Sequence, residues 1–277
     1  MRISVTGSRG FIGGHVRAHA ESLGHEVAGF DLREGNDILG DLGALKGANA
    51  IIHLAGLLGT HEMFDFIEDS VKTNVLGTTR LAVWAAENNA QLTTVNTPNC
   101  FPSIYNATKV AAQAIVNVMT QDGMLKSSSL TVYNCYGTHH KTADPTKRIP
   151  RKFTPTWATA AWNNKPIQIW GDGSHLMDLI STEEVSRIFV EATAFTNGEV
   201  FDAGTGTGFT VKEVAEFFLK VTGSTAGIEY LPMRRGEAKT NVPATGRGWE
   251  LLTRPPTFDW DHLASVIEWY KGMEVVQ

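Results

Sequence analysis

The glycine-rich segment TGSRGFIG at residues 6–13 constrains the fold more than any other part of the chain. It follows a short apolar stretch, RISVTG, and precedes a segment of helical periodicity at 11–23. Gly7 permits a tight turn, Gly10 lets the backbone approach a pyrophosphate, and Gly13 lets the helix pack closely against the strand. The N-terminus of the helix adds amide donors and a positive dipole. A strand, a glycine turn and a helix in this order predict the first unit of a dinucleotide-binding domain.

The end of the second predicted strand, HEVAGFD, indicates which dinucleotide is bound. Asp31 closes this strand, where its carboxylate can accept hydrogen bonds from both hydroxyls of an adenosine ribose. The same charge would repel a 2′-phosphate. We therefore expect NAD as the cofactor and regard NADP as the less favoured alternative, which Arg9 and Arg33 keep open because they lie close in the sequence.

The rest of the chain alternates short apolar runs with longer segments of helical period. ANAIIHLAG, QLTTVNT and SSLTVYNCYG indicate strands, and the segments 70–89 and 103–122 indicate helices. Strict alternation predicts an α/β fold, a Rossmann-type doubly wound parallel sheet with a smaller C-terminal substrate-binding lobe. The predicted division assigns 1–147 and about 176–205 to the dinucleotide-binding domain, and about 148–175 and 206–277 to the smaller lobe.

Composition and charge argue against several classes of protein. With 42% apolar and 19% charged residues and no apolar run long enough to cross a bilayer, the chain is not expected in a membrane. The net charge of −5 and the absence of a basic block argue against nucleic-acid binding. The first residues enter a strand without the blocks of a secretory signal, so we expect a cytoplasmic location. No metal site is expected, because His139 and His140 have no carboxylate or cysteine at ligand spacing and are interpreted as a solvated pair.

The stretch NTPNCFPSIYNATK, residues 96–109, contains a candidate for proton transfer. Tyr105 and Lys109 are four residues apart on a predicted helix that Ser103 can cap, so both side chains project from one face. A phenol titrates near pH 10 in water, whereas a neighbouring ammonium and an oxidised nicotinamide favour the phenolate. Tyr105 can therefore act as a general base with the help of Lys109.

The order of the motifs along the chain resembles that of the extended short-chain dehydrogenase/reductase superfamily. The set comprises the glycine loop at 6–13, Asp31, Asp41 with Leu42, HLAG at 53–56, Asn74 in NVLGT, YNATK at 105–109, NCYG at 134–137, GDGS at 171–174 and RGE at 235–237. Within that superfamily the chain is similar to the NAD-dependent epimerase/dehydratase family, in particular to its nucleotide-sugar epimerases. The resemblance covers nearly the whole length.

The resemblance implies roles for individual residues. The cofactor-binding set that we predict from it and from the glycine loop is Gly7, Arg9, Gly10, Phe11, Ile12, Gly13, Asp31, Arg33, Asp41, Leu42, Leu54, Ala55, Gly56, Asn74 and Lys109. By the same resemblance, Asp41 and Leu42 lie at the adenine, and Lys109 holds the nicotinamide ribose. Thr97 matches the family's hydroxyl residue, so that Thr97, Tyr105 and Lys109 form the predicted catalytic set.

On the substrate side, the resemblance implies that Asn134 and Arg235 face the diphosphate of a sugar nucleotide. It also implies a homodimer, because relatives dimerise through the pair of helices at 70–89 and 103–122. The predicted partner is thus a small-molecule substrate, a nucleotide sugar, with neither a nucleic acid nor a membrane involved.

Three departures from the family's pattern bear on the reaction. Only seven residues separate Thr97 from Tyr105, where relatives have a considerably longer loop, so the lid over the site is reduced. Pro98 and Asn99 stand where the superfamily's dehydratases carry an acid and a base, which argues against dehydration. Met177 replaces an arginine that relatives usually direct toward the phosphates. Diphosphate binding is then weakened or transferred to Arg148, Arg151, Arg234, Arg235 or Arg254.

Three functions remain open at this point. The favoured one is NAD-dependent nucleotide-sugar 4-epimerisation through a transient 4-keto sugar, with Tyr105 as acid and base. A reductase or dehydrogenase of a keto sugar or small carbonyl would use the same catalytic set but would show net conversion of NAD(P)H. A non-catalytic dinucleotide sensor would bind the cofactor and would not depend on the Tyr105 hydroxyl.

Overall fold

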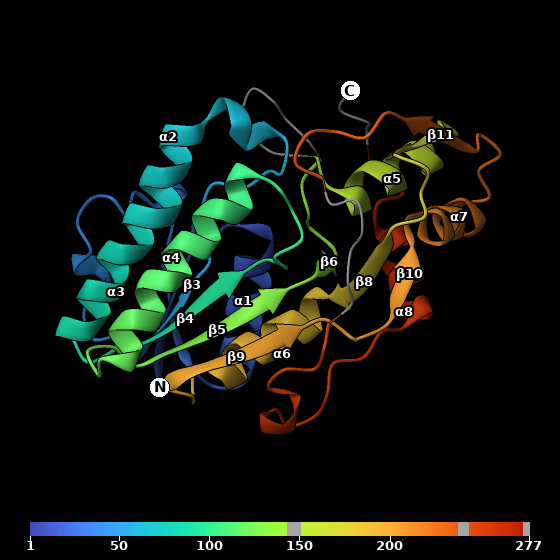
Figure 1. Ribbon diagram of the computed structural model, residues 1–277. Helices are drawn as coiled ribbons and strands as arrows, with labels where there is room; N and C mark the ends of the chain where they lie inside the picture. Colours follow the sequence, from blue (N-terminus) through green and yellow to red (C-terminus); the bar gives the residue numbers. More distant parts are fainter. Residues whose placement is uncertain (143–150, 238–243, 274–277) are drawn as a thin grey trace.

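The computed structural model describes residues 1–142, 151–237 and 244–273, and its centre is a six-stranded sheet (Figure 1). The strand order is β2-β1-β3-β4-β5-β9, and every neighbouring pair is parallel. The strands are β1 (Arg2–Thr6), β2 (Glu26–Phe30), β3 (Ala50–His53), β4 (Gln91–Asn96), β5 (Ser127–Val132) and β9 (Asn197–Ala203). The strand order reverses at β1, because β2 lies on one side of it and β3 with the later strands lies on the other. Ligands of such sheets bind at the carboxyl ends of the strands beside this reversal. The predicted fold class is confirmed.

Helices cover both faces of this sheet. On one face α1 packs against α6, and on the other α3 packs against α4 (Figure 1). Their bounds are α1 (Phe11–Ser22), α6 (Thr182–Ala192), α3 (Thr78–Glu87) and α4 (Ile104–Gln121). Each turns buried residues at helical spacing toward the sheet. In the part of the chain that the structure describes, no helix is long and apolar enough to cross a membrane.

The helix predicted at 70–89 changes its winding along its length. It begins as α2 (Ile67–Ser70), continues as a π-helical segment, η4 (Val71–Gly77), and becomes α3. π-Helical segments are rare and are found frequently at functional sites. Asn74 lies inside this segment and is buried. The local winding therefore decides which side of the helix presents Asn74.

The C-terminal part of the chain forms a second, smaller body beside the sheet (Figure 1). It contains a three-stranded sheet in the order β10-β8-β6 and a two-stranded sheet, β11-β7. The bounds are β6 (Asn134–Tyr136), β7 (Ile167–Trp170), β8 (Leu176–Ser181), β10 (Gly208–Thr210), β11 (Ile228–Leu231), α5 (Phe153–Trp162), α7 (Val211–Thr222) and α8 (Trp260–Trp269). Short 3-10 turns lie at Leu32–Glu34, Gly43–Leu45, Glu62–Asp65 and Trp249–Leu251. A separate apolar cluster that includes Trp157 and Phe218 fills this body, and the predicted limits of the two lobes stay a prediction.

The predicted strand SSLTVYNCYG divides into two strands at Tyr133. Val132 still pairs with Ala203 of the large sheet, whereas Asn134 pairs with Leu179 of the small one. Between them the Cys135 N–H donates to the Tyr133 carbonyl oxygen at 2.9 Å, which closes a tight turn. The chain thus passes from one sheet to the other at this point, and the residues after Tyr133 lie where the two bodies meet.

Candidate active site

The glycine loop between β1 and α1 is closed by contacts that only glycine allows. Gly7 has a φ of +68°, and a Cβ there would lie 2.7 Å from the Ala55 nitrogen and 2.8 Å from the Leu54 carbonyl carbon. A Cβ at Gly13 would overlap the carbonyl oxygen of Gly7. Gly10 is the N-cap of α1, and no described side chain caps this helix. Its first-turn amides are therefore available to an anion, and the loop fits a pyrophosphate.

Asp31 lies directly beside this loop and fixes two of its neighbours. Its carboxylate accepts hydrogen bonds from the backbone N–H of Arg9 at 3.0 Å and of Arg33 at 2.9 Å. Both arginine side chains are already paired, Arg9 with Glu34 at 2.8 Å and Arg33 with Asp31 at 3.3 Å. Because carboxylates neutralise both cations, the surroundings suit a ribose with free hydroxyls better than a 2′-phosphate. This arrangement fits NAD.

The strand end after β3 is held from both sides. The N–H groups of Leu54 and Ala55 both donate to the Thr6 hydroxyl at 3.1 Å. The Asn74 carboxamide accepts from the Leu57 N–H and donates to the Leu57 carbonyl, each at 2.9 Å. It donates further to the Thr108 hydroxyl of α4 at 3.0 Å. Asn74 therefore fixes the predicted cofactor wall relative to the helix that carries Tyr105 and Lys109.

The other predicted cofactor residues have mixed surroundings. Asp41 is exposed and accepts a hydrogen bond from the Gly43 N–H at 3.0 Å, whereas Leu42 is buried in the core beside β2 and β3. Gly56 faces Asn74, whose Oδ1 would lie 3.0 Å from a Cβ at this position. Ile12 packs on the apolar core of the large sheet. Leu42 and Ile12 can shape the cofactor site mainly through packing.

The three predicted catalytic residues come from two adjacent elements. Thr97 follows the last residue of β4, and Tyr105 and Lys109 lie in the first two turns of α4. Ser103 caps α4 by accepting a hydrogen bond from the Asn106 N–H at 3.2 Å, as predicted. Because parallel strands end at the same edge of a sheet, Thr97 and the glycine loop share one edge. The short connection thus returns Tyr105 to the expected side of the sheet.

Burial sets the protonation of this group. It raises the pKa of Tyr105 to about 12 and lowers the pKa of Lys109 to about 8. It also lowers the pKa of His53 to about 3, and the charge of Lys109 acts in the same direction. The Lys109 ammonium therefore lies near the end of β3. Desolvation is the cause of the raised pKa of Tyr105, which is opposite to the lowering that the sequence predicted from Lys109. The charge of an oxidised nicotinamide would lower this pKa.

Asn106 is a central residue of the site that the sequence did not suggest. Its Oδ1 accepts from the Thr97 hydroxyl at 2.8 Å, and its Nδ2 donates to Asn99 Oδ1 at 2.9 Å and to the Phe101 carbonyl at 3.2 Å. One buried carboxamide therefore holds the whole connection between β4 and α4. The sequence signal that could have indicated this role is a polar residue, Asn106, directly after Tyr105 and close to an unusually short loop.

A group of cations lies between the two bodies, and we call it the cleft cations. It comprises Arg151, Lys152 and Arg234. The guanidinium carbons of Arg151 and Arg234 lie 4.8 Å and 3.9 Å from the centre of the Trp170 ring. Burial lowers the pKa of Lys152, and nearby Glu62 and Glu237 act in the opposite direction. Arg234 already pairs with Glu237. The three cations nevertheless outnumber the two carboxylates that act on Lys152, so the group has a formal net positive charge.

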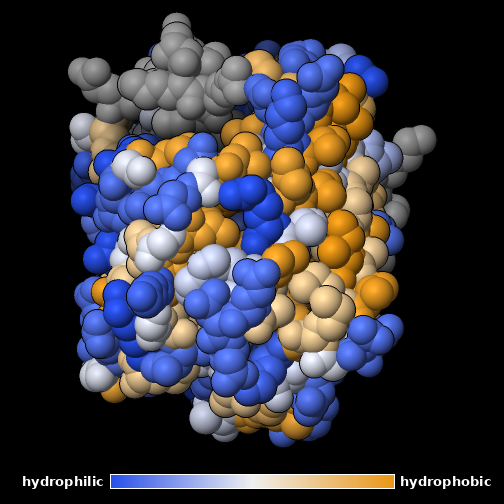
Figure 2. All heavy atoms as spheres, turned by 90° about the vertical axis from the view of Figure 1, so that its left-hand side faces the viewer, coloured by the Kyte–Doolittle hydropathy of each residue, from blue (hydrophilic) through white to orange (hydrophobic). Residues whose placement is uncertain are grey.

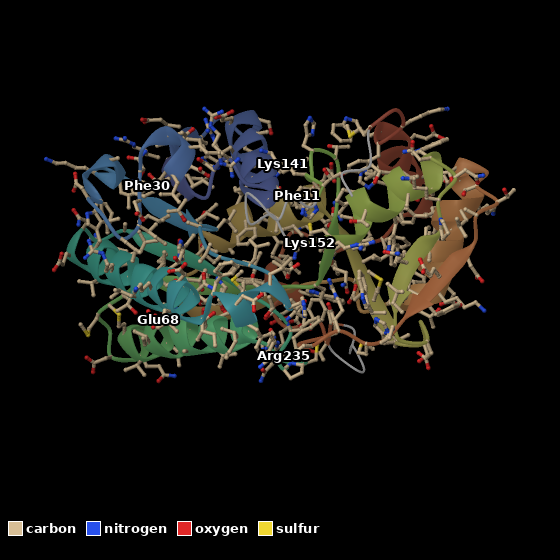
Figure 3. The ribbon with its side chains drawn as sticks, turned by 90° about the horizontal axis from the view of Figure 1, so that it is seen from above. Phe11, Phe30, Glu68, Lys141, Lys152 and Arg235 are labelled. Atoms are coloured by element: carbon tan, nitrogen blue, oxygen red, sulfur yellow. The ribbon has the colours of Figure 1, made fainter. Side chains whose placement is uncertain are left out.

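The residues predicted at the diphosphate are separated. Arg235 stacks over Phe64 at 3.7 Å and lies apart from Lys152 in Figure 3. Its neighbour Arg234 belongs to the cleft cations instead. Asn134 begins β6, next to Cys135, on which the charge of Lys152 acts.

Two further candidates are engaged elsewhere. Met177 is buried in the core of the smaller body, and Arg254 pairs with Glu184 of α6. Arg148 lies outside the described residues. Of the alternatives for the missing arginine, Arg151 and Arg234 therefore have the most suitable positions.

The interpretation of His139 and His140 as a solvated pair is wrong for His140. Its ring stacks on Phe11 of the glycine loop, with centroids 3.8 Å apart and planes 9° from parallel. Burial lowers its pKa to about 3, and the Tyr270 hydroxyl donates to its carbonyl at 3.2 Å. His139 remains exposed. The chain after β6 folds back over the glycine loop, a long-range contact that spacing does not reveal. Among the residues with described positions, no group of three or more His, Cys, Asp or Glu could hold a metal ion.

Comparison with known families agrees with this geometry. The model of the NAD dependent epimerase/dehydratase family matches residues 3–204. The chain belongs to this family. It is therefore an NAD-dependent enzyme of the extended short-chain dehydrogenase/reductase type, which confirms the expected cofactor and class.

Individual relatives are distant but cover nearly the whole chain. The chain is 25% identical to the UDP-glucose 4-epimerase of Mycolicibacterium smegmatis, over 98% of this chain and 99% of the relative. It is 24% identical to the dTDP-glucose 4,6-dehydratase of Streptomyces niveus, over 98% and 93%. The solved UDP-glucose 4-epimerase of Thermotoga maritima superposes with a TM-score of 0.88 at 20% identity, covering 98% and 99% of the two chains. At this identity the superposition supports the fold alone.

Proposed function

We propose that the chain is an NAD-dependent nucleotide-sugar 4-epimerase in which Tyr105 is the acid and base. The observation that carries the proposal is the position of Thr97, Tyr105 and Lys109 at the edge of the sheet that also holds the glycine loop. Both sugar-nucleotide epimerases and a dehydratase occur among the relatives. Pro98 and Asn99 follow Thr97, and neither can transfer a proton, which favours epimerisation over dehydration.

Each catalytic residue has a distinct task in this proposal. Bound NAD supplies a reversible hydride acceptor for the carbon that carries the reacting hydroxyl. Tyr105 removes the proton from the 4-hydroxyl and returns it after the 4-keto sugar has turned over. Lys109 holds the nicotinamide ribose and favours the phenolate of Tyr105. Thr97 would hydrogen-bond the reacting oxygen by turning its hydroxyl proton away from Asn106 Oδ1, to which it donates in this structure.

The cleft cations are the proposed diphosphate site. Arg151 and Arg234 present guanidinium groups beside Trp170, and Lys152 adds an ammonium between the two bodies. Guanidinium groups bind phosphate oxygens in pairs of parallel hydrogen bonds. These residues would take the role of the arginine that relatives usually have at the position of Met177. Arg235, which stacks on Phe64, would then support the cleft rather than contact phosphate.

A homodimer is proposed through the outer surface of α2, η4, α3 and α4. Figure 2 views the side of the molecule where these helices lie and shows apolar side chains on it. The exposed apolar residues of these helices are Ile67, Val71, Leu76, Val83, Val110 and Val118. Contiguous exposed apolar surface of this kind marks interaction sites. The cytoplasmic location stays a prediction.

The proposal is tested on the protein as purified. The protein is denatured and any released dinucleotide is identified by mass, and native protein is then incubated with UDP-, dTDP- and GDP-hexoses while 4-epimers are followed by NMR. We expect bound NAD and epimer formation without net NADH. An empty site with net consumption of NAD(P)H on a panel of carbonyl compounds would instead establish a reductase. Cofactor binding without turnover in either assay would establish a sensor.

A further inference from the structure

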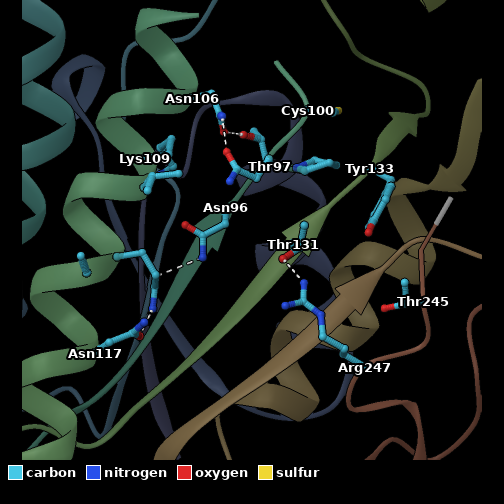
Figure 4. A pocket seen from close by; sticks show the side chains of 15 residues that line it. Asn96, Thr97, Cys100, Asn106, Lys109, Asn117, Thr131, Tyr133, Thr245 and Arg247 are labelled. Atoms are coloured by element: carbon cyan, nitrogen blue, oxygen red, sulfur yellow. Dashed lines mark hydrogen bonds between the residues drawn. The ribbon is translucent and has the colours of Figure 1, made fainter. Parts of the chain in front are cut away.

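A cavity of about 470 Å³ opens on the outer side of α4, and we call it the outer cavity (Figure 4). This volume lies in the range of about 300–1,000 Å³ that is usual for small-molecule sites. Its walls come from the stretch after β4, from α4 and from the end of β5. Thr97 and Lys109 belong to its wall, whereas Tyr105 does not. The outer cavity thus begins at the catalytic residues and extends away from Tyr105.

The short connection between β4 and α4 leaves this space open. Pro98, Asn99 and Cys100 form one side of the outer cavity. Asn106 holds this stretch back against the start of α4 through its bonds to Asn99 and Phe101. A group attached to the substrate near the hydroxyl that Thr97 binds can therefore enter the outer cavity without displacing the connection.

The charge of the walls favours an uncharged occupant. In the described part of the chain, no carboxylate lines the outer cavity. Arg247 is neutralised by Asp202, with Nη2 and Oδ1 2.8 Å apart, and it donates to the Thr131 hydroxyl at 3.1 Å. The ammonium of Lys109 acts on His53 on the cofactor side. An ammonium group would find no carboxylate in this lining, and of the two cations in the wall Arg247 is already paired.

The remaining polar groups of the walls suit hydroxyls and amides. Five carboxamide side chains line the outer cavity, from Asn96, Asn99, Asn106, Gln113 and Asn117. Figure 4 shows several of them on the α4 side, facing Thr131 and Tyr133 across the cavity. The Asn96 oxygen, the Asn117 amide nitrogen and the Tyr133 hydroxyl form no hydrogen bond with any described residue. They leave both acceptors and donors for a neutral polar group.

We propose that the outer cavity is a subsite for an uncharged polar substituent carried by the sugar next to its reacting carbon. The substrate class is then a substituted nucleotide hexose, with an amide or hydroxyl-bearing group at C3 or C6, rather than an unsubstituted one. This inference rests on the proposed function, because it takes Thr97 as the residue that binds the reacting hydroxyl. Ala114 provides an apolar surface on which such a group can rest. Val110 also lines the outer cavity, and it is one of the exposed apolar residues of the proposed dimer surface.

The test compares matched nucleotide hexoses on the NAD-loaded protein. The probes are the plain UDP-hexose and its analogues with an acetamido group in place of the hydroxyl at C3 or at C6. Dissociation constants are measured by titration calorimetry, and kcat/KM for 4-epimerisation by NMR. We expect at least one acetamido sugar to bind about tenfold more tightly than the plain sugar, which corresponds to about 1.4 kcal/mol.

Two variants of α4 separate a subsite from a general effect. Ala114→Phe would fill the outer cavity and remove the preference for the acetamido sugar. The control Ala111→Phe places the same ring at an exposed position of α4 that does not line the cavity, and it should keep the preference. Equal affinity of the wild-type protein for all three sugars, or an equal loss for all three in Ala114→Phe, would overturn the inference. Turnover of the plain sugar without any preference refutes the subsite alone, whereas no binding and no turnover of any of the three refutes the proposed function and the subsite with it.

Discussion

Removal of the Asn106 carboxamide should destabilise the site and the fold together. Asn106 is buried, and its side chain forms three hydrogen bonds, with the Thr97 hydroxyl, the Asn99 carboxamide and the Phe101 carbonyl. Each such bond contributes about 0.5–1.5 kcal/mol net, so Asn106→Ala should lower the free energy of unfolding by about 2–4 kcal/mol. A change of about 1 kcal/mol shifts the melting temperature of a chain of this size by about 2–4 °C. We therefore expect a fall of about 4–16 °C.

The assay is thermal unfolding followed by circular dichroism at a fixed NAD concentration. Asn117→Ala is the matched control, because Asn117 lies on the same helix, is exposed, and accepts one hydrogen bond, from Gln113 at 2.7 Å. It should change the melting temperature by less than about 2 °C. If Asn106→Ala melts within 2 °C of the wild-type protein, Asn106 does not hold the connection as described.

Three further predictions concern pH, substrate and cofactor. Burial lowers the pKa of His53 from 6.5 to about 3. As the pH falls, the unfolded chain therefore binds a proton at His53 before the folded chain does. The free energy of unfolding should accordingly decrease between pH 6.5 and pH 3, by up to about 1.4 kcal/mol per pH unit. His53→Asn should flatten this part of the stability profile and His61→Asn, at an exposed position, should not; equal profiles would contradict the burial of a neutral imidazole. Arg234→Ala should raise the KM for the nucleotide sugar about tenfold or more, and Arg235→Ala should raise it much less. A larger effect of Arg235→Ala would show that Arg235, rather than Arg234, binds the diphosphate. Asp31→Ala removes the carboxylate beside the ribose and leaves Arg33 without its ion-pair partner. The affinity for NADP relative to NAD should therefore rise at least tenfold in fluorescence titrations. An unchanged ratio would show that Asp31 does not contact the ribose.

Local spacing was sufficient to predict the parts of the site that lie within one turn or one helix. The glycine loop, the cap at Ser103 and the shared face of Tyr105 and Lys109 depend on residues no more than seven positions apart. Their geometry follows from backbone requirements that a short segment expresses by itself. The alternation of strands and helices likewise determined the parallel sheet, since parallel strands need crossover helices.

Contacts between distant segments were not predictable in the same way. His140 reaches Phe11 only because the chain after β6 folds back, and the spacing of two histidines gives no sign of that path. The neighbours Arg234 and Arg235 differ in their partners, Trp170 and Phe64, although the family resemblance placed Arg235 at the diphosphate and gave Arg234 only as an alternative. The outer cavity has the same origin, because it depends on how a short connection lies against α4 and the end of β5.

The central claim is reversible oxidation at C4 of a sugar with Tyr105 as acid and base, and an isotope label tests it most directly. A nucleotide hexose carrying deuterium on C4 is incubated with the NAD-loaded protein, and the position of the label in the 4-epimer is read by NMR and mass spectrometry. The account predicts that deuterium stays on C4 of the product, and that Tyr105→Phe forms this product about 10²–10⁴-fold more slowly with its NAD content unchanged. Exchange of the label with water during epimerisation, or full activity of Tyr105→Phe, would contradict the account.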